Sequence, residues 1–264
     1  MSINAFGLLQ KLKNTKPVVH HITNWVTIYQ CAEIVKAFGG SPVMAHASQE
    51  AADMAGIASS LVLNIGTLTE EIINSMKIAG LAANKKGIPV ILDVCGAGAT
   101  KHRDEKCAEL LKDVRVDVIK GNSSEIARIA GENVFTKGVD SADVNTDMKI
   151  LARNLAKQRN CTVVVTGKTD IVTNGTVNYQ IHNGCDMMTH VVGTGCMAAS
   201  VIGIFCAVEK DYALAASAGL VCFEIAAELA NQNAAGPGTF LSVLFDEAYK
   251  LDKESLDRMI RVEP

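Results

Sequence analysis

The chain has 264 residues, of which 48% are hydrophobic and 20% are charged, so a disordered protein or a coiled coil is excluded and a globular protein is predicted. Lysine and arginine total 25 against 28 acidic residues, a formal net charge of -3, and the sequence has no basic run that would indicate nucleic-acid binding. Without a linker or an internal repeat, we expect a single domain over residues 1–264.

The cysteine pattern indicates a reducing compartment. The eight cysteines form no C-x-x-C pair and no compact framework. A structural zinc site is not expected, because His20 and His21 are the one close pair of possible ligands and would point opposite ways on a strand. Residues 1–16 lack the apolar core of a secretory signal. The uncharged run at 191–208 begins with glycines and has no aromatic anchor, so we interpret it as a buried helix and not as a membrane span. A cytoplasmic protein is predicted.

Strand and helix patterns alternate along most of the chain. After an amphipathic first segment, strands are expected at 18–22, 42–45, 61–65, 88–94, 116–119 and 162–165, and helices at 25–38, 49–58, 70–85, 104–112, 125–130 and 147–158. In the helix at 25–38 the periodicity places five residues on one apolar face: Trp25, Ile28, Tyr29, Ala32 and Val35.

The pattern changes after residue 167. Short strands at 171–173 and 177–181 flank Asn174-Gly175, a strong hairpin signal, and this hairpin is expected to close one edge of the sheet. Three helices are expected to follow, at 196–208, 212–230 and 240–250. The order predicts a three-layer α/β sandwich with a mostly parallel central sheet, in which ligands bind beyond the carboxyl ends of the strands.

Polar clusters follow three of the predicted parallel strands. They are Asp93 with Gly96, Gly98 and Thr100; Lys120 with Asn122 and Glu125; and Thr166 with Gly167. Two carboxylates, Asp93 and Glu125, suit Mg²⁺ held partly through water, and Lys120 would add positive charge beside phosphates. The alternative is that Asp93 caps a loop and Glu125 complements the dipole of a helix first turn.

A fourth cluster, Gly193-Thr194-Gly195-Cys196, precedes a strongly apolar helix. Backbone N–H groups and the helix dipole at such an end can bind a phosphoryl oxygen, and the glycines allow close approach. The same position should lower the pKa of the Cys196 thiol, which makes Cys196 a candidate base or nucleophile. By contrast, Cys206 and Cys222 are expected in the core, and His46 and His102 are taken as structural or surface residues.

Two nucleotide-binding fingerprints match only in part. A P-loop ending at Lys168-Thr169 would need glycine at position 162, which is threonine. The G-x-G-x-x-A pattern at Gly193, Gly195 and Ala198 lacks a following strand with an acidic residue, so neither fingerprint is assigned.

Taken together, six motifs resemble hydroxyethylthiazole kinase from about Pro17 to Leu244. They are Val19-His20-His21-Ile22-Thr23-Asn24, Ser41-Pro42-Val43-Met44-Ala45-His46, Leu92-Asp93 with Gly96-Ala97-Gly98-Ala99-Thr100, Lys120-Gly121-Asn122-Ser123-Ser124-Glu125, Val165-Thr166-Gly167 and Gly193-Thr194-Gly195-Cys196. The resemblance implies a ribokinase-like fold and transfer of the ATP γ-phosphoryl group, with Mg²⁺, to the primary hydroxyl of 4-methyl-5-(2-hydroxyethyl)thiazole in thiamine salvage. Related ribokinase-like enzymes usually have aspartate where this chain has Cys196.

The resemblance also implies roles for individual residues and an assembly, a homotrimer with sites between subunits. The implied residues are Met44, Asn24, Gly66, Thr67 and Gly193 for the thiazole; Lys120, Thr166 and Asn122 for ATP; Gly193, Gly195 and Cys196 for catalysis; and Asp93 and Glu125 for Mg²⁺. One departure is that the family commonly has Pro-Val where this chain has Val94 and Cys95.

Two other functions remain open at this point. One is a ribokinase-like kinase for another small alcohol, against which Cys196 in place of aspartate weighs. The other is a catalytically silent ATP-binding regulator, which the intact set of Asp93, Glu125, Lys120 and Cys196 disfavours.

Overall fold

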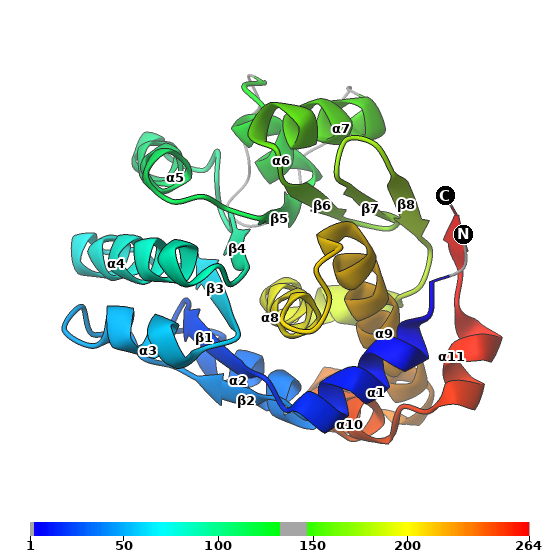
Figure 1. Cartoon of the computed structure of the whole chain (residues 1–264). Helices are drawn as coiled ribbons and strands as arrows, with labels where there is room; N and C mark the ends of the chain where they lie inside the picture. Colours follow the sequence, from blue (N-terminus) through cyan, green and yellow to red (C-terminus); the bar gives the residue numbers. More distant parts are fainter. Residues whose placement is uncertain (1–2, 133–146, 264) are drawn as a thin grey trace.

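A single twisted sheet organises the structure, which is a computed structural model that describes residues 3–132 and 147–263 (Figure 1). Within these residues the sheet has nine strands in the order β2-β1-β3-β4-β5-β6-β7-β8-β9. The strands are β1 (Val18–Ile22), β2 (Ser41–Val43), β3 (Ser60–Asn64), β4 (Val90–Asp93), β5 (Val118–Asn122), β6 (Thr162–Thr166), β7 (Asp170–Thr173), β8 (Asn178–Ile181) and β9 (Val262–Glu263). The pairs from β2 to β6 are parallel, and those from β6 to β9 are antiparallel.

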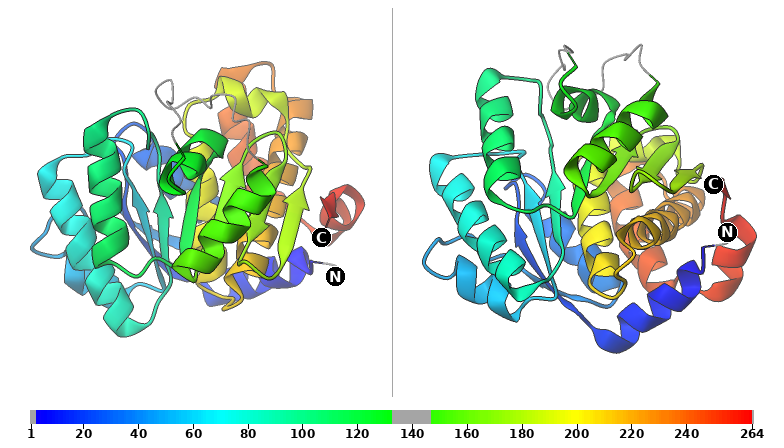
Figure 2. Two further views of the ribbon diagram at one scale, coloured as in Figure 1. Left: turned by 90° about the horizontal axis from the view of Figure 1, so that it is seen from above. Right: turned by 45° about the horizontal axis from the view of Figure 1, so that its top comes forward.

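Helices cover both faces of this sheet (Figure 2). One layer contains α3 (Ala51–Ile57), α4 (Glu70–Lys86), α5 (Lys101–Asp113), α6 (Ser123–Ile129) and α7 (Met148–Arg159). The other contains α1 (Ala5–Thr15), α2 (Ile28–Ala37), α8 (Thr194–Cys206), α9 (Tyr212–Asn233), α10 (Pro237–Lys250) and α11 (Lys253–Met259). A short 3₁₀ helix, η1 (Asp186–His190), precedes α8. The predicted three-layer sandwich with a mostly parallel sheet is confirmed.

The alternation of side chains along each strand creates two separate cores. In β3, Leu61 and Leu63 pack beneath α3 and α4, whereas Val62 between them packs in the core that contains α8. Ile91 of β4 and Val118 of β5 face the α8 side in the same way. Because alternate side chains of a strand face opposite sides of the sheet, the last residue that faces α8 is fixed by the residues before it in the same strand.

Helix α8 crosses the middle of the sheet and is buried from Cys196 to Cys206. Gly203 makes its close approach possible, because a Cβ there would lie 2.4 Å from Cγ2 of Val62. Among the described residues one helix, α9, is long and apolar enough to cross a bilayer, and 83% of its apolar window is buried inside the protein. The interpretation of 191–208 as a buried helix agrees with α8.

The start of α2 differs from the prediction. The helix begins at Ile28, and it buries Cys31, Ile34 and Val35, whereas Trp25 and Tyr29 are 58% and 65% exposed. The predicted apolar face was therefore wrong for the two aromatic residues. Trp25 lies in a turn at residues 25–27 before the helix, and Tyr29 lies in α2 on the side away from the face that buries Cys31, Ile34 and Val35.

The C-terminal elements α11 and β9 were not predicted. The two-residue strand β9 pairs with β8, so the hairpin of β7 and β8 lies next to the edge of the sheet and does not close it. A strand of two residues is too short to carry a periodic pattern.

Candidate active site

The carboxyl ends of β3, β4 and β5 place three polar side chains in one row. Asn64 is the register partner of Asp93, and Asp93 is the register partner of Lys120. Each stands two residues after a side chain of the core on the α8 side, so all three face α8. Their exposed fractions are 2%, 0% and 4%, so the row is buried.

Asp93 and Lys120 form a buried ion pair, with Lys120 Nζ 3.4 Å from Asp93 Oδ1. Burial raises the pKa of the Asp93 carboxyl well above its ordinary range, and the Lys120 ammonium opposes that rise. Burial also disfavours the charged amine of Lys120, but the carboxylates of Asp93 and Glu125 outweigh it and raise the pKa of Lys120. Lys120 therefore stays cationic beside the strand ends.

Glu125 and Asn122 form a capping box at the start of α6. The Asn122 side chain accepts from the Glu125 N–H at 2.9 Å, and Glu125 Oε2 accepts from the Asn122 N–H at 2.7 Å. The other carboxylate oxygen, Oε1, accepts from the N–H of Gly96 at 2.7 Å. Glu125 thus lies in the first turn of α6, as expected of a residue that complements the helix dipole. It also holds the glycine loop after β4 against the end of β5. Burial raises its pKa.

Thr166 ends β6 beside this box. It is the register partner of Asn122, and its Oγ1 donates to the carbonyl of Gly121 at 3.4 Å. The following N–H, of Gly167, donates to Asp170 Oδ1 at 2.9 Å, which fixes the turn into β7. Lys120, Asn122 and Thr166 therefore lie on two adjacent strand ends.

Cys196 lies in the first turn of α8 and is 9% exposed. A hydrogen bond from the Cys95 thiol is the main reason that its pKa is lowered to about 5; burial opposes this shift, while the Lys120 charge and hydrogen bonds with Thr27 and Asn24 support it. The lowered pKa favours the thiolate form of Cys196. In contrast, burial raises the pKa values of Cys206 and Cys222, which are core residues as predicted.

Two glycines shape the beginning of α8. Gly193 has φ +97°, and a Cβ there would lie 2.7 Å from Cγ2 of Thr27. Gly195 faces Lys120, since a Cβ there would lie 3.2 Å from Lys120 Nζ. No side chain in the described chain caps this helix end, and the first N–H groups of a helix have no helical acceptor. The turn can accept an anion close to its backbone.

The residues implied for the alcohol are joined to the row in different ways. Asn24 Nδ2 donates to Cys196 Sγ at 3.3 Å, and Gly66 N donates to Asn64 Oδ1 at 2.8 Å. Thr67 Oγ1 accepts from the N–H of Trp25 at 3.0 Å. Met44 stands apart on the neighbouring strand end, after β2.

His46 connects the Met44 segment to β1. Its Nδ1 lies 3.1 Å from the carbonyl oxygen of Met44, and its Nε2 lies 3.1 Å from the backbone of Thr23. The structural role predicted for His46 agrees with these contacts.

Sequence reasoning missed two residues of this region. Asn64 was overlooked because it belongs to no recognisable motif, and the one available signal was a polar residue that ends a buried strand. Arg103 was overlooked because α5 is otherwise a solvated helix; its guanidinium donates to the carbonyls of Ile65, Cys95 and Gly66 and so binds two strand-end loops together.

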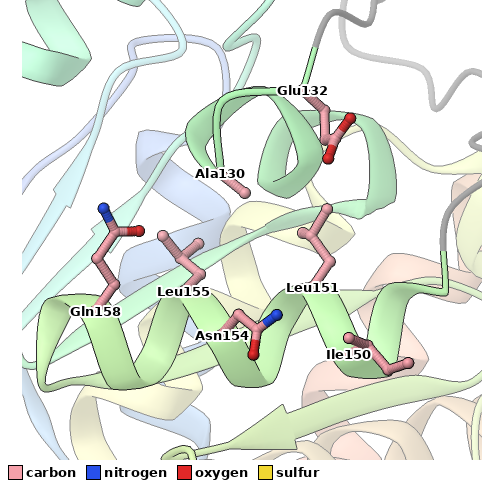
Figure 3. Close-up of a pocket in the computed structure, with 7 residues that line it drawn as sticks. All are labelled: Ala130, Glu132, Ile150, Leu151, Asn154, Leu155 and Gln158. Carbon is pink, nitrogen blue, oxygen red and sulfur yellow. The ribbon is translucent and has the colours of Figure 1, made fainter.

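A separate pocket lies between the end of α6 and α7 (Figure 3). It is lined by Ala130, Glu132, Ile150, Leu151, Asn154, Leu155 and Gln158. None of these is a predicted site residue, so the pocket gives no support to the candidate site.

The fold belongs to the ribokinase-like class. A ribokinase-like superfamily protein from Enterococcus faecalis superposes with a TM-score of 0.64 over 95% of this chain and 98% of its own, at 12% identity, which supports the fold alone. More specific similarity comes from the sequence: residues 9–254 match the hydroxyethylthiazole kinase family. A hydroxyethylthiazole kinase from Methanosarcina mazei is 54% identical over 97% of this chain and 98% of its own.

A solved structure agrees with this assignment. The hydroxyethylthiazole kinase protein from Pyrococcus horikoshii has a TM-score of 0.91 and 38% identity, with 98% of each chain covered. The chain therefore belongs to the hydroxyethylthiazole kinase family. It is an enzyme of the kinase class, and the resemblance expected from the six motifs is confirmed.

Proposed function

We propose that the enzyme transfers the γ-phosphoryl group of ATP to the primary hydroxyl of 4-methyl-5-(2-hydroxyethyl)thiazole, with Mg²⁺, and so provides the thiazole phosphate for thiamine salvage. The observation that carries this proposal is the position of Cys196. Its thiol, whose pKa is lowered to about 5, lies at the start of α8, where no side chain of the described residues caps the helix. The amide of Asn64 lies between this thiol and the Asp93–Lys120 ion pair. The proposed base Cys196, the proposed anion site at the start of α8 and the Lys120 ammonium therefore lie close together.

Phosphoryl transfer requires positioning and neutralisation of charge more than covalent chemistry by the protein. In the proposal, Lys120, Thr166 and Asn122 bind ATP at the ends of β5 and β6. The backbone N–H groups that begin at Gly193 and include Gly195 surround the transferred group, where a helix N-terminus stabilises negative charge.

The two carboxylates suit a divalent cation held with the nucleotide. Asp93 and Glu125 are both buried, and Glu125 lies close enough to contribute to the raised pKa of Asp93. The described residues contain no group of three His, Cys, Asp or Glu side chains that would form an all-protein cage. Mg²⁺ commonly uses one or two carboxylates together with phosphates and water. Asp93 and Glu125 would hold the ion, which would supply charge neutralisation on the phosphates when bound.

The proton of the alcohol would move to Cys196. As the hydroxyl oxygen forms its bond to the γ-phosphorus, the bond from that phosphorus to the ADP oxygen breaks, and Cys196 Sγ accepts the hydroxyl proton. Met44, Asn24, Gly66, Thr67 and Gly193 would contact the thiazole alcohol.

The proposed assembly is a homotrimer with sites between subunits. The turn before α2 exposes Trp25 and Val26 at 58% and 62%, Tyr29 lies just beyond it, and Val192 before α8 is 68% exposed. Four large apolar side chains around the candidate site suit burial by a second copy of the chain. The mass in solution tests this: a stable monomer at micromolar concentration contradicts it. The eight free cysteines suit the proposed cytoplasmic location, with neither a membrane nor nucleic acid as partner.

ADP release tests the reaction. With Mg²⁺ and ATP, hydroxyethylthiazole is compared with hydroxymethylpyrimidine, pyridoxal and ribose in one assay. Selective turnover of the thiazole supports the proposal. Turnover of another alcohol alone would overturn the substrate assignment around Met44, and ATP binding without turnover of any alcohol would favour the regulator.

A further inference from the structure

Asn64 is the one member of the buried row to which the motifs give no role. It ends β3 beside Asp93 and is 2% exposed. An amide in such a place needs hydrogen-bond partners, and a buried amide left unpaired would be costly. The identity of those partners indicates what Asn64 does.

The orientation of the Asn64 amide is fixed by its neighbours. Oδ1 accepts from the backbone N–H of Gly66 at 2.8 Å, and a backbone N–H can only donate. Nδ2 must therefore point to the other side, where it meets Asp93 Oδ2 at 2.7 Å and Cys196 Sγ at 3.3 Å. The two hydrogens of the amide nitrogen are directed at a carboxylate and a sulfur.

Asn24 approaches the same sulfur from another strand end. Its Oδ1 accepts from both N and Oγ1 of Thr27 at 3.1 Å, so its Nδ2 is also fixed in orientation. That nitrogen donates to Cys196 Sγ at 3.3 Å and to Asn64 Oδ1 at 3.0 Å. Two amides thus donate to one sulfur, an arrangement that favours a charged acceptor over a neutral thiol.

We infer that Asn64 is a positioning residue for phosphoryl transfer: its amide holds the Cys196 sulfur at a fixed place relative to Asp93 and stabilises the thiolate, the form of Cys196 that has room for the hydroxyl proton. This inference rests on the proposed function and deepens it. Asn64 links the proton-accepting group on α8 to the side chain proposed for the cation on β4.

The test uses Asn64→Leu, which has a similar size and no N–H, and Asn64→Asp, which keeps an acceptor for Gly66. Ser60→Ala is the matched control, because Ser60 begins the same strand, is buried, and has a hydroxyl without a hydrogen-bond partner among the described residues. Measurements are kcat, KM for ATP, and the pH midpoint of alkylation of the Cys196 peptide by iodoacetamide, followed by mass spectrometry.

For the Asn64 variants we expect kcat to fall at least about tenfold, with KM for ATP changed less than about threefold, and the pH midpoint of Cys196 alkylation to move upward because the thiolate loses a hydrogen-bond donor. Ser60→Ala should match the parent protein in all three. In a Cys196→Ala background, Asn64→Leu should change the remaining kcat by less than about twofold, because a residue that acts through Cys196 has nothing left to position.

An unchanged pH midpoint of Cys196 alkylation, or a full additional loss of kcat in the Cys196→Ala background, would overturn the inference. If Asn64→Leu does not fold, Asn64→Asp decides by the same readouts. If no alcohol is phosphorylated by the parent protein, the proposed function fails, and the alkylation comparison still decides whether Asn64 holds the sulfur.

Discussion

The Lys120 ammonium faces the first turn of α8 at Gly195, with 3.2 Å between Nζ and the position of a Cβ on that glycine. A cation beside the positive end of a helix is stabilised here by the carboxylates of Asp93 and Glu125. A single carbon atom added at Gly195 would therefore crowd the Lys120 ammonium.

Gly195→Ala is expected to lower kcat/KM for ATP by about tenfold or more, because the methyl group displaces Lys120 or the turn by a fraction of an ångström. The thermal midpoint should not fall, since alanine favours a helix more than glycine does. Steady-state kinetics and thermal unfolding measure the two effects. Gly56→Ala in α3, where a Cβ meets open space, is the control, and equal kinetics for both variants would contradict the prediction.

Cys196→Ser is expected to reduce kcat by at least about tenfold without loss of ATP affinity. Serine is a far weaker proton acceptor than a thiolate, while the backbone N–H groups of the turn remain. Single-turnover kinetics and ATP binding by calorimetry separate the two quantities. Cys222→Ala, in the core far from the row, should lose stability and keep its kcat; unchanged turnover in Cys196→Ser would exclude Cys196 as a base.

Cys95→Val should make Cys196 titrate at higher pH. The folded-state pKa of Cys196 is lowered to about 5, so the thiolate is present at neutral pH and is lost as the pH falls through that value. The hydrogen bond from Cys95 is the largest cause of the lowering, and its removal should shift the midpoint upward by about one unit or more. The pH dependence of Cys196 alkylation measures the midpoint. An unshifted curve would show that Cys95 does not act on this thiol.

Glu224→Gln should remove part of the pH dependence of stability. Burial raises the pKa of Glu224 well above its ordinary range, and a hydrogen bond with Asp170 adds to the rise. An acid with a raised folded-state pKa stabilises the fold below its unfolded pKa and loses that contribution as pH rises toward the folded value. Between the ordinary glutamate pKa and the raised folded-state pKa, each pH unit removes up to about 1.4 kcal/mol of the stability that this one group contributes.

Glutamine keeps a donor toward Asp170 and cannot ionise. The free energy of unfolding, measured by urea denaturation from pH 5 to pH 9, should therefore decline less steeply in Glu224→Gln than in the parent protein. Parallel curves for the two proteins would contradict the prediction. Glu254→Gln, at the exposed start of α11, is the control and should follow the parent curve.

The sequence allowed prediction of the layers and of most strand ends, because buried parallel strands are continuous apolar runs and polar residues interrupt them where they end. Asp93 and Lys120 were found in this way, and Cys196 was found from the glycine turn that precedes an apolar helix. Asn64, the partner of Asp93 and Cys196, could not be found, since its role depends on the register of β3 against β4. The exposure of Trp25 could not be predicted from hydrophobic periodicity either, because residues 25–27 form a turn and not the first turn of the helix.

Register has a practical consequence for redesign. Neighbouring parallel strands stand about 4.8 Å apart, so the spacing of Asn64, Asp93 and Lys120 is set by backbone ladder hydrogen bonds and not by loops. The segments that begin at Thr23, Met44 and Gly66 lie outside those ladders. Exchanging them with the corresponding segments of relatives should change which alcohol fits while the phosphate-handling row keeps its dimensions, so acceptor choice and transfer chemistry can be altered separately.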